Sequence, residues 1–451
     1  MIADALYRRI WRWHFYAGLF VLPFVLLLSV TGSIYLFKPQ IDRWEERDFR
    51  GLGTRGAVSA DAQLESALAA FPGASFNYYR LPERPGDAAV IALASTHGEP
   101  AQVFVSPQGQ VLGTLDPRTR ISEVVKRLHG ELLLGKWGDR LVELVASWTI
   151  VMILTGLYLW WPRPFRLAGT LWPRLSLRGR PLLKDIHRTI GFWIAGLVLV
   201  MLASGLPWAG TWGSAFAWTR AELGLMKGAQ QWEVGAADDT RHHHATPILT
   251  PAGSSRPASG PPLSTFVAKA DAERMAYPVE VLPPFAPQLF GPPTGDEWTA
   301  QSMAQNRRLV RSVTYDPRTG AETGRTGFAD KHVIDQVVQT GIAWHEGQLL
   351  GLANQLVGVA TALALIGISI LGAVMWLRRR PRGRLGAPPA ARGATGPALV
   401  AAVALLGVLM PLFGASVAAI TVVDGVVRLA RRGRSGAGCL APSGREVDNA
   451  S

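Results

Sequence analysis

The chain contains four long apolar segments separated by polar ones. The apolar segments cover residues 15–37, 141–161, 189–219 and 347–377. A helix needs about 20 residues to cross the hydrocarbon core of a bilayer, so each segment predicts a transmembrane helix. A signal peptide is the alternative for the first segment. That segment is longer than a typical signal-peptide core, and the bulky residues after Ser33 do not form a cleavage site, so we expect an uncleaved helix.

The two long polar connections predict small α+β domains. Residues 61–71 have the apolar spacing of an amphipathic helix, and residues 88–93 and 102–105 have the composition of strands. A strand expected at 312–315, with a turn after it, repeats this pattern in the second connection. Residues 235–262 are rich in Pro, Ser, Gly and Ala, which predicts a flexible linker.

A fifth apolar stretch, residues 393–423, allows two interpretations. Pro411 interrupts it, and four arginines between residues 428 and 434 follow it. A single kinked span would leave these arginines outside, whereas a re-entrant or hairpin segment would return them to the other side. The sequence leaves this choice open.

The two halves of the chain repeat the same spacing of histidines and small residues. His14 is followed after 4, 17 and 18 residues by Gly, Thr and Gly, and His187 is followed by Gly, Ser and Gly at the same distances. His129 and His345 are each followed after 6, 27 and 31 residues by Gly, Gly and Trp. A unit of helix, outer domain and helix, written twice, explains this pattern.

We therefore expect a mostly α-helical membrane protein, in which duplicated two-helix units form a four-helix transmembrane core. Two small α+β domains and a C-terminal apolar segment complete it. The expected parts are the N-terminus and first span 1–37, the first outer domain 38–137, the second span 138–161, a basic loop 162–187, the third span 188–210, the second outer domain 211–345, the fourth span 346–377, a basic loop 378–395, the apolar segment 396–427 and a tail 428–451.

The distribution of charge predicts how the chain is oriented. Residues 162–187 contain six basic residues and one acid, and residues 378–392 contain six arginines and no acid. The long connections are balanced, with 11 basic and 11 acidic residues in 38–128, and 12 and 13 in 211–344. The positive-inside rule therefore places the N-terminus and the basic loops in the cytoplasm. The net charge of +13 reflects these flanks and the lipid headgroups near them, and it does not indicate nucleic-acid binding.

The single cysteine, Cys439, limits the cofactor chemistry. The chain can form no internal disulfide, no Cys-rich metal or iron–sulfur site and no covalent c-type haem site. A Gly-rich dinucleotide or phosphate loop in its strand–turn–helix setting is also missing from the sequence. A redox group would therefore be held by histidine. The consecutive histidines 242–244 favour a solvated loop over a metal site, because they lie in the linker.

Each of the four long apolar segments has one histidine at or near its start, where an ionisable ring is costly without a partner. Two imidazoles from two helices can hold a haem iron from both faces. We expect His14 to pair with His187 near the cytoplasmic face, and His129 with His345 near the outer face. Single histidines at helix ends often serve only as caps or headgroup contacts, but four in a repeated pattern favour haem-iron ligands.

Three arginines near these histidines, Arg12, Arg188 and Arg127, are candidates to pair with haem propionates. The position of His129 requires a further condition. A straight helix from His129 to Trp161 would lift the ring above the bilayer, so we expect the chain to bend at the glycines that follow His129.

The histidines belong to longer motifs. These are Trp13-His14 with Thr31-Gly32, Leu128-His129-Gly130 with Thr155-Gly156-Leu157-Tyr158-Leu159-Trp160-Trp161-Pro162, Asp185-Ile186-His187-Arg188, and Trp344-His345-Glu346-Gly347. In these motifs the chain resembles the PepSY-associated transmembrane family over residues 8–380. The resemblance implies PepSY-like outer domains, non-covalent haem b, two per chain, and a place in the bacterial inner membrane. FoxB- and PiuB-type members of this family are ferric-siderophore reductases.

The resemblance predicts a transmembrane, haem-dependent ferric or ferric-siderophore reductase. Electrons would pass from the cytoplasm to a periplasmic ferric chelate, and Fe(II) would be released for uptake. The cytoplasmic electron donor is either a quinol or a flavin- or NAD(P)H-dependent reductase, and the sequence does not distinguish between them. The first alternative is a haem-free PepSY-type binding or regulatory protein, which a haem assay distinguishes. A transporter is a weaker alternative, because features of broken helices occur only around Pro207 and Pro411.

Overall fold

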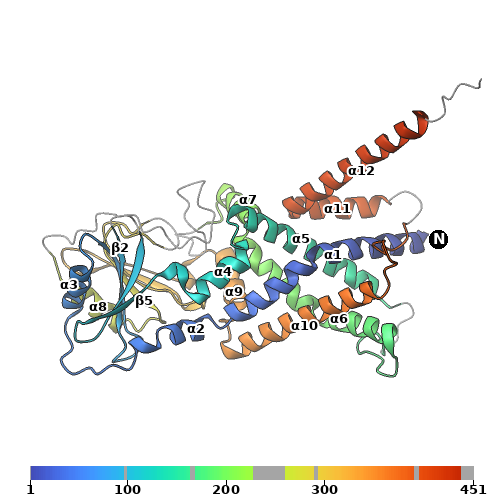
Figure 1. Cartoon of the computed structure of the whole chain (residues 1–451). Helices are drawn as coiled ribbons and strands as arrows, with labels where there is room; N and C mark the ends of the chain where they lie inside the picture. Colours follow the sequence, from blue (N-terminus) through green and yellow to red (C-terminus); the bar gives the residue numbers. More distant parts are fainter. Residues whose placement is uncertain are drawn as a thin grey trace, which may run out of the picture. The chain divides into compact units, whose positions relative to one another are not determined.

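The computed structural model describes residues 2–95, 99–162, 168–226, 260–288, 293–390 and 396–437. The chain forms two compact units, Met1–Ala391 and Arg392–Ser451. The predicted linker lies outside the described residues except for its last three positions, and so do His242, His243, His244 and Cys439. The first unit consists of a helix bundle and a β-sheet (Figure 1).

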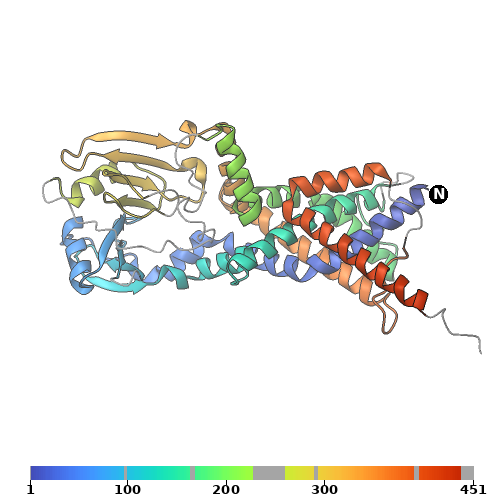
Figure 2. The same cartoon turned by 90° about the horizontal axis from the view of Figure 1, so that it is seen from above.

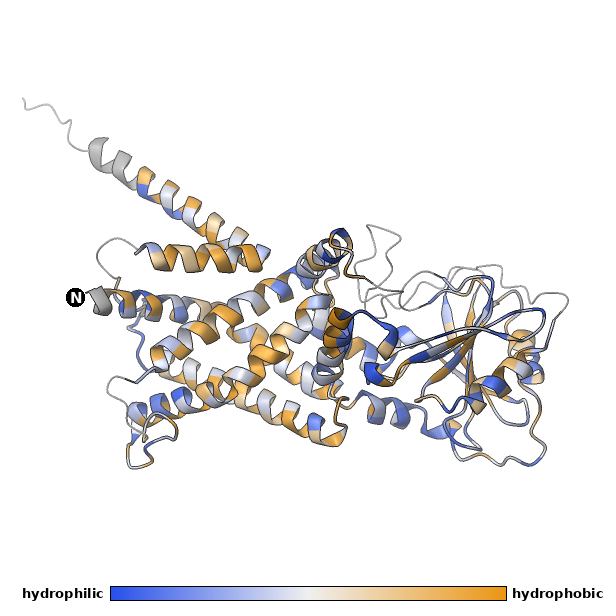
Figure 3. Ribbon diagram, turned by 180° about the vertical axis from the view of Figure 1, so that it is seen from behind, coloured by the Kyte–Doolittle hydropathy of each residue, from blue (hydrophilic) through white to orange (hydrophobic). Residues whose placement is uncertain are grey.

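Four long helices form the bundle: α1 (Ile2–Tyr35), α5 (Lys136–Trp160), α6 (Gly179–Gly205) and α10 (Leu352–Leu377). Helix α1 packs against α5 and α10, and α6 packs against the same two helices, so α1 and α6 lie on opposite sides of the bundle. Apolar residues dominate these helices (Figure 3). Large apolar side chains such as Leu154, Val200 and Leu363 are exposed on them, as lipid-facing residues would be.

The lengths and compositions of these helices agree with the four predicted spans. Within the described residues, the helical segments that are long and apolar enough to cross a membrane are Ala5–Tyr35, Lys136–Trp160, Gly179–Trp208, Leu352–Leu377 and Pro411–Ala430. The first four correspond to the expected transmembrane helices, and the fifth belongs to the C-terminal apolar segment.

Eight antiparallel strands form one sheet in the order β4-β3-β2-β1-β5-β6-β7-β8. The first long connection contributes β1 (Ser75–Arg80), β2 (Ala89–Ala94), β3 (Pro100–Val105) and β4 (Val111–Leu115). The second contributes β5 (Val279–Leu282), β6 (Trp298–Ser302), β7 (Arg311–Tyr315) and β8 (Glu322–Gly327). The sequence predicts two separate α+β domains, but the halves join where β1 pairs with β5. This pairing satisfies two strand edges that would otherwise be open.

One face of the sheet is covered by two helices, α3 (Ala60–Ala70) and α8 (Leu263–Ala272). The core beneath them includes Tyr79, Ile91, Val281 and Ala300, all of them buried. Helix α3 and strands β2, β3 and β7 lie where the apolar pattern predicts them. The opposite face of the sheet is more polar and is described below with the cavity that it lines.

Shorter helices connect the sheet to the bundle: α2 (Lys38–Glu45), α4 (Ile121–Glu131), α7 (Gly210–Glu222) and α9 (Val333–His345). Figures 1 and 2 show α2 and α4 between the sheet and the bundle. In both halves the chain runs in the same order: a long helix, a short helix, a helix on the sheet, four strands, a short helix and a second long helix.

The chain makes a sharp turn between α4 and α5, as the position of His129 requires. Leu132, Leu133 and Gly135 have φ values of 52°, 58° and 58°. Gly138 lies so close to the end of α4 that a Cβ atom there would be 1.7 Å from the carbonyl oxygen of Glu131. Only glycine fits this position, and the turn brings α4 back beside α1.

The second unit contains α11 (Pro397–Leu409) and α12 (Pro411–Ala437). The chain turns at Met410, and α12 runs back beside α11 (Figure 1). A Cβ atom at Gly414 would lie 2.7 Å from the carbonyl oxygen of Gly407, so the two helices touch where glycine leaves room. The described part of this segment therefore forms a helical hairpin.

Candidate functional site

Two of the four histidines face each other at the end of the bundle nearest the sheet, which we call the sheet end. His129 comes from α4 and His345 from the last residue of α9. Their ring centres are 6.3 Å apart and their planes are inclined by 75°. Two imidazole nitrogens that bind one metal from opposite sides, each about 2.0 Å away, place the ring centres about 6.3 Å apart. The pair therefore has the spacing of two ligands to one metal.

Hydrogen bonds to Nδ1 set the tautomer of both rings. His345 Nδ1 lies 2.9 Å from the carbonyl oxygen of Met201, and a carbonyl only accepts, so Nδ1 carries the proton. His129 Nδ1 lies 3.0 Å from Thr31 Oγ1, and that hydroxyl already donates to the carbonyl oxygen of Leu27, so it accepts from the ring. Both rings therefore keep the Nε2 lone pair for a metal. Burial also lowers the pKa of His345, which favours the neutral imidazole.

The second pair, His14 and His187, is held in the same way. His14 Nδ1 lies 3.1 Å from both the carbonyl oxygen of Met152 and Thr155 Oγ1 on α5. His187 Nδ1 lies 3.0 Å from the carbonyl oxygen of Ile368 on α10. The two rings come from α1 and α6, on opposite sides of the bundle, and they lie close enough for their charged forms to repel each other.

A glycine on a neighbouring helix makes room for the edge of each ring. A Cβ atom at Gly32, Gly205 or Gly156 would lie 3.1, 3.1 and 3.2 Å from Cε1 of His129, His345 and His14, respectively. At Gly372 the corresponding distance to His187 Cε1 is 3.7 Å. These are the glycines at the repeated offsets in the sequence. Helices α1 and α6 each carry one histidine and also the glycine that accommodates a histidine from another element.

The two pairs lie far apart along the bundle. His14 and Gly32 are 18 residues apart on α1, and His187 and Gly205 are 18 residues apart on α6. At about 1.5 Å per residue, each interval spans about 27 Å along its helix. One pair therefore lies at the sheet end and the other lies towards the opposite end, where α1 begins.

A cavity of about 1080 Å³ runs from the sheet-end histidines to the sheet. Inside the bundle most of its lining is apolar, including Val25, Leu28, Val145, Val198 and Leu365, and His129, His345 and the acids Asp139 and Glu143 line it as well. Its volume is slightly above the range of about 300–1,000 Å³ typical of small-molecule and cofactor sites. Apolar walls with two neutral imidazoles suit a large, flat, mostly apolar group that binds metal.

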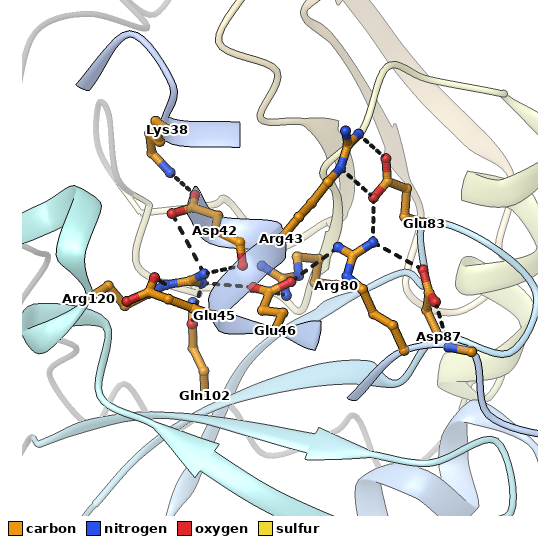
Figure 4. A network of polar contacts seen from close by, with 12 residues as sticks. Lys38, Asp42, Arg43, Glu45, Glu46, Arg80, Glu83, Asp87, Gln102 and Arg120 are labelled. Atoms are coloured by element: carbon orange, nitrogen blue, oxygen red, sulfur yellow. Dashed lines mark hydrogen bonds and ion pairs between the residues drawn. The ribbon is translucent and has the colours of Figure 1, made fainter. Parts of the chain in front are cut away.

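Towards the sheet the lining of the cavity becomes polar and charged. Figure 4 shows the network of acidic and basic side chains there. Glu46 accepts hydrogen bonds of 2.8 Å from both Arg80 and Arg120. Burial alone would raise the pKa of this carboxyl, but the two arginines outweigh it and lower the pKa to about 2. Arg50 forms ion pairs with Glu83 and Asp87 at 2.8 and 3.4 Å.

The three arginines predicted to contact propionates have other partners in the structure. Arg12 donates to the carbonyl oxygen of Pro388 at 2.9 Å, and Arg188 donates to the carbonyl oxygen of Trp160 at 3.0 Å. Both lie close in sequence to the His14–His187 pair. Arg127 forms an ion pair with Glu131 at 3.2 Å, and it does not line the cavity. Two cations of the sheet end that do line it are Lys126 and Arg307.

Some residues at the site were not identified from the sequence. The ring of Trp208 lies 6.4 Å from that of His345, centre to centre, and is nearly perpendicular to it. Trp208 sits in the 3₁₀ turn Leu206–Trp208 after α6. Thr31, Thr155 and Ser204 bind histidine Nδ1 atoms from other elements. The repeated Thr-Gly or Ser-Gly pairs were the available signal, but the sequence alone does not show which ring each pair contacts.

Comparison with known proteins agrees with the motifs. A family model described as the PepSY-associated TM region matches residues 11–379, a segment that contains all four histidines and both long connections. No match was found among curated proteins. With its apolar helices, the family match makes this a multi-pass membrane protein. The chain belongs to the PepSY-associated transmembrane family.

Proposed function

We propose that this protein is a di-haem b oxidoreductase that carries electrons across a bacterial inner membrane to a ferric chelate. The observation that carries the proposal is the geometry of His129 and His345. Their ring centres are 6.3 Å apart, and both Nδ1 atoms are engaged in hydrogen bonds that leave Nε2 as the ligand atom. The second pair, His14 and His187, has the same Nδ1 arrangement.

The donor set fits haem better than a metal ion alone. Within the described ranges, no three His, Cys, Asp or Glu side chains gather where they could hold a metal ion. Each pair would therefore supply only two ligands, on opposite sides of the metal, and leave the other positions to a planar macrocycle. Haem held by two histidines is a one-electron carrier without an open position for oxygen.

The residues around each pair orient the ligands and exclude water. Thr31, Met201, Met152 and Ile368 hold the Nδ1 atoms, which fixes each ring plane. Apolar side chains of α1, α5, α6 and α10 form the walls of the cavity inside the bundle. At the sheet end, Lys126 and Arg307 line the cavity and are candidates to meet propionates.

The charge distribution supports an orientation with the N-terminus in the cytoplasm and the sheet in the periplasm. The cavity then opens on the periplasmic side, where a ferric siderophore or another ferric chelate would be the electron acceptor. One electron converts Fe(III) to Fe(II), which binds hard oxygen donors less tightly and is released for uptake. A cytoplasmic reductase or quinol would supply the electron.

A pyridine haemochrome assay on the purified protein tests the proposal. Four histidines in two pairs predict two non-covalent haem b groups per chain when the cells have ample haem. The oxidised and dithionite-reduced spectra should show low-spin haem, because two histidines would hold each haem iron. Protein that folds and carries no haem under these conditions would refute the proposal, and a haem-free PepSY-type binding or regulatory role would then account for the cavity.

A further inference from the structure

The hairpin of α11 and α12 lies outside the segment that the family model matches, which ends at residue 379. The chain before it shows where it begins. Arg12 of α1 donates to the carbonyl oxygen of Pro388, so residue 388 lies at the end of the bundle opposite the sheet. Only eight residues, one of them Arg392, separate Pro388 from Pro397, the first residue of α11. A short connection that carries an arginine does not cross a bilayer, so α11 starts on the side of the membrane that has the basic loops.

Both arms of the hairpin are shorter than the membrane is thick. Helix α11 has 13 residues, all uncharged, and the first 13 residues of α12, 411–423, are uncharged as well. At about 1.5 Å per residue each apolar arm is about 20 Å long, whereas the hydrocarbon core is about 30 Å thick. The second arm runs back beside the first (Figure 1), so arms of equal length return the chain to the level at which it entered. An inserted hairpin of this length would turn inside the core, about 10 Å short of the opposite face.

The turn between the arms is built for an apolar environment. The amide of Met410 donates to the carbonyl oxygen of Leu406 at 2.9 Å, and the carbonyl oxygen of Met410 accepts from the amide of Gly414 at 3.0 Å. Pro411, the first residue of α12, has no N–H group to satisfy. These features reduce the number of backbone groups that the turn leaves to lipid, where an unpaired group is costly. The apolar side chain of Val408, next to the turn, is 79% exposed, as expected for a residue that faces acyl chains.

Charged residues begin where α12 would leave the core. The first one after the turn is Asp424, and Arg428 forms an exposed ion pair with it at 2.6 Å. Positions 431 and 432 are also arginines, and their spacing of three and four residues from Arg428 places the three positions on one side of the helix. By the arm lengths, Asp424 would lie level with the start of α11, and Arg428 about 6 Å beyond it. Guanidinium groups at this level can meet the phosphate groups of anionic lipids.

We propose that α11 and α12 form a re-entrant hairpin that enters and leaves the membrane on the side of the basic loops, and that Arg428, Arg431 and Arg432 bind anionic phospholipid headgroups there. The proposal does not involve the histidine pairs, so it holds for the protein with or without haem. It differs from a fifth transmembrane span, which would carry the end of the chain to the side of the membrane that has the sheet.

The single cysteine of the chain, Cys439, follows α12 and can report on which side the hairpin leaves the membrane. An impermeant maleimide would be applied to spheroplasts and to inverted membrane vesicles that contain the full-length protein. Two reference variants combine Cys439→Ser with one new cysteine, either Ser176→Cys in the first basic loop or Thr54→Cys in the segment before α3, both at exposed positions. We expect Cys439 to react at least tenfold faster in the preparation that labels Ser176→Cys. Labelling of Cys439 from the side that labels Thr54→Cys would overturn the proposal.

Native mass spectrometry of the full-length protein in detergent, with added phosphatidylglycerol or phosphatidylcholine, tests the headgroup contact. The unchanged protein should bind the anionic lipid more tightly, and replacing all three arginines of the α12 end with glutamine should weaken that binding at least fivefold, because each arginine contributes to the attraction. The matched control replaces three exposed arginines of the outer segments with glutamine, Arg55, Arg84 and Arg318, and should bind the anionic lipid as the unchanged protein does. Equal affinity for the two lipids, or unchanged affinity in the variant of the α12 end, would overturn the proposal.

Discussion

Gly32 and Gly205 show how much of the site depends on the absence of a single methyl group. Each glycine lies on a bundle helix and faces Cε1 of a histidine from another element. Glycine in a helix interior costs about 1 kcal/mol relative to alanine, so retaining it there calls for a specific reason. Room for the imidazole edge is that reason in this structure.

Gly32→Ala should therefore disturb haem at the sheet end without harming the fold. The added Cβ atom would be 3.1 Å from His129 Cε1, so the ring has to shift from its hydrogen bond with Thr31. We expect a changed reduced-minus-oxidised spectrum and loss of one of the two haems on dilution. The control is Gly191→Ala on α6, where a Cβ atom would meet nothing within 4 Å. An unchanged spectrum and haem content for Gly32→Ala would contradict this role of Gly32.

Glu46 makes the stability of the sheet domain sensitive to acid. Arg80 and Arg120 overcome the effect of burial and hold the pKa of Glu46 at about 2, whereas a glutamate in the unfolded chain has a pKa near 4.5. Because the folded pKa is the lower one, this stabilisation is complete above pH 4.5 and is lost as the pH falls towards 2. It amounts to about 3 kcal/mol, at 1.36 kcal/mol per pKa unit.

Thermal melts of the unchanged protein and of Glu46→Gln, recorded between pH 7 and pH 3, would measure this contribution. The variant should melt at a lower temperature at pH 7, and the difference should shrink as the pH falls. Glu65→Gln is the control, because this carboxyl is exposed on α3. A difference for Glu46→Gln that stays constant with pH would show that its ion pairs do not stabilise the fold.

At the scale of elements, local patterns predict the spans, but they do not predict how the two outer segments join. A run of apolar residues is sufficient to indicate α1, α5, α6 and α10. The β1–β5 junction pairs Tyr79 with Val281, and nothing in either short strand identifies its partner. Strand pairing between distant segments depends on which edges the rest of the fold leaves open.

The sharp turn before α5 is predictable only in part. Its glycines indicate a bend, but the positive φ of Leu132 and Leu133 could not be predicted, because leucine rarely adopts it. The repeat likewise predicts which histidines lie at the same level. It does not predict which groups form hydrogen bonds with the Nδ1 atoms. Those groups lie on helices that a loop or an outer segment separates from the histidine along the chain.

The elements that carry the four histidines predict which substitutions affect the same haem. His14 and His187 come from α1 and α6, whereas His129 and His345 come from α4 and α9. Replacing either member of one pair with alanine should remove the same haem, and should leave the other haem spectrally intact. Haem content and redox titration of the four single variants would test this. Loss of one common haem in both His14→Ala and His129→Ala would refute the pairing.

At the scale of the whole molecule, the two pairs divide the membrane. The bilayer core is about 30 Å thick, and the pairs are separated by intervals of about 27 Å along α1 and α6. Haems at these positions would place one carrier near each face, so the cytoplasmic donor and the outer acceptor would each meet a haem on their own side of the membrane. Both pairs should therefore be necessary for transmembrane reduction.

Vesicles loaded with reductant and containing the reconstituted protein would measure this transfer. An impermeant ferric chelate and a ferrous-specific dye would be placed outside. The unchanged protein should produce external Fe(II), and either His187→Ala or His345→Ala should lower the rate at least a hundredfold. Vesicles without protein give the background. External reduction by His345→Ala at the full rate, despite loss of its haem, would show that the relay is not the function.

Helices α1 and α6 each carry one histidine and one glycine that makes room for a histidine of another element. This arrangement also constrains when the two pairs can form during synthesis. The sheet-end pair needs α1, α4, α6 and α9, and the other pair needs α1, α5, α6 and α10. During synthesis, neither pair is complete until the ribosome has passed His345, the last residue of α9. If the pairs hold haem as proposed, haem would be inserted only after nearly the whole chain has entered the membrane, and a truncated half should not retain it.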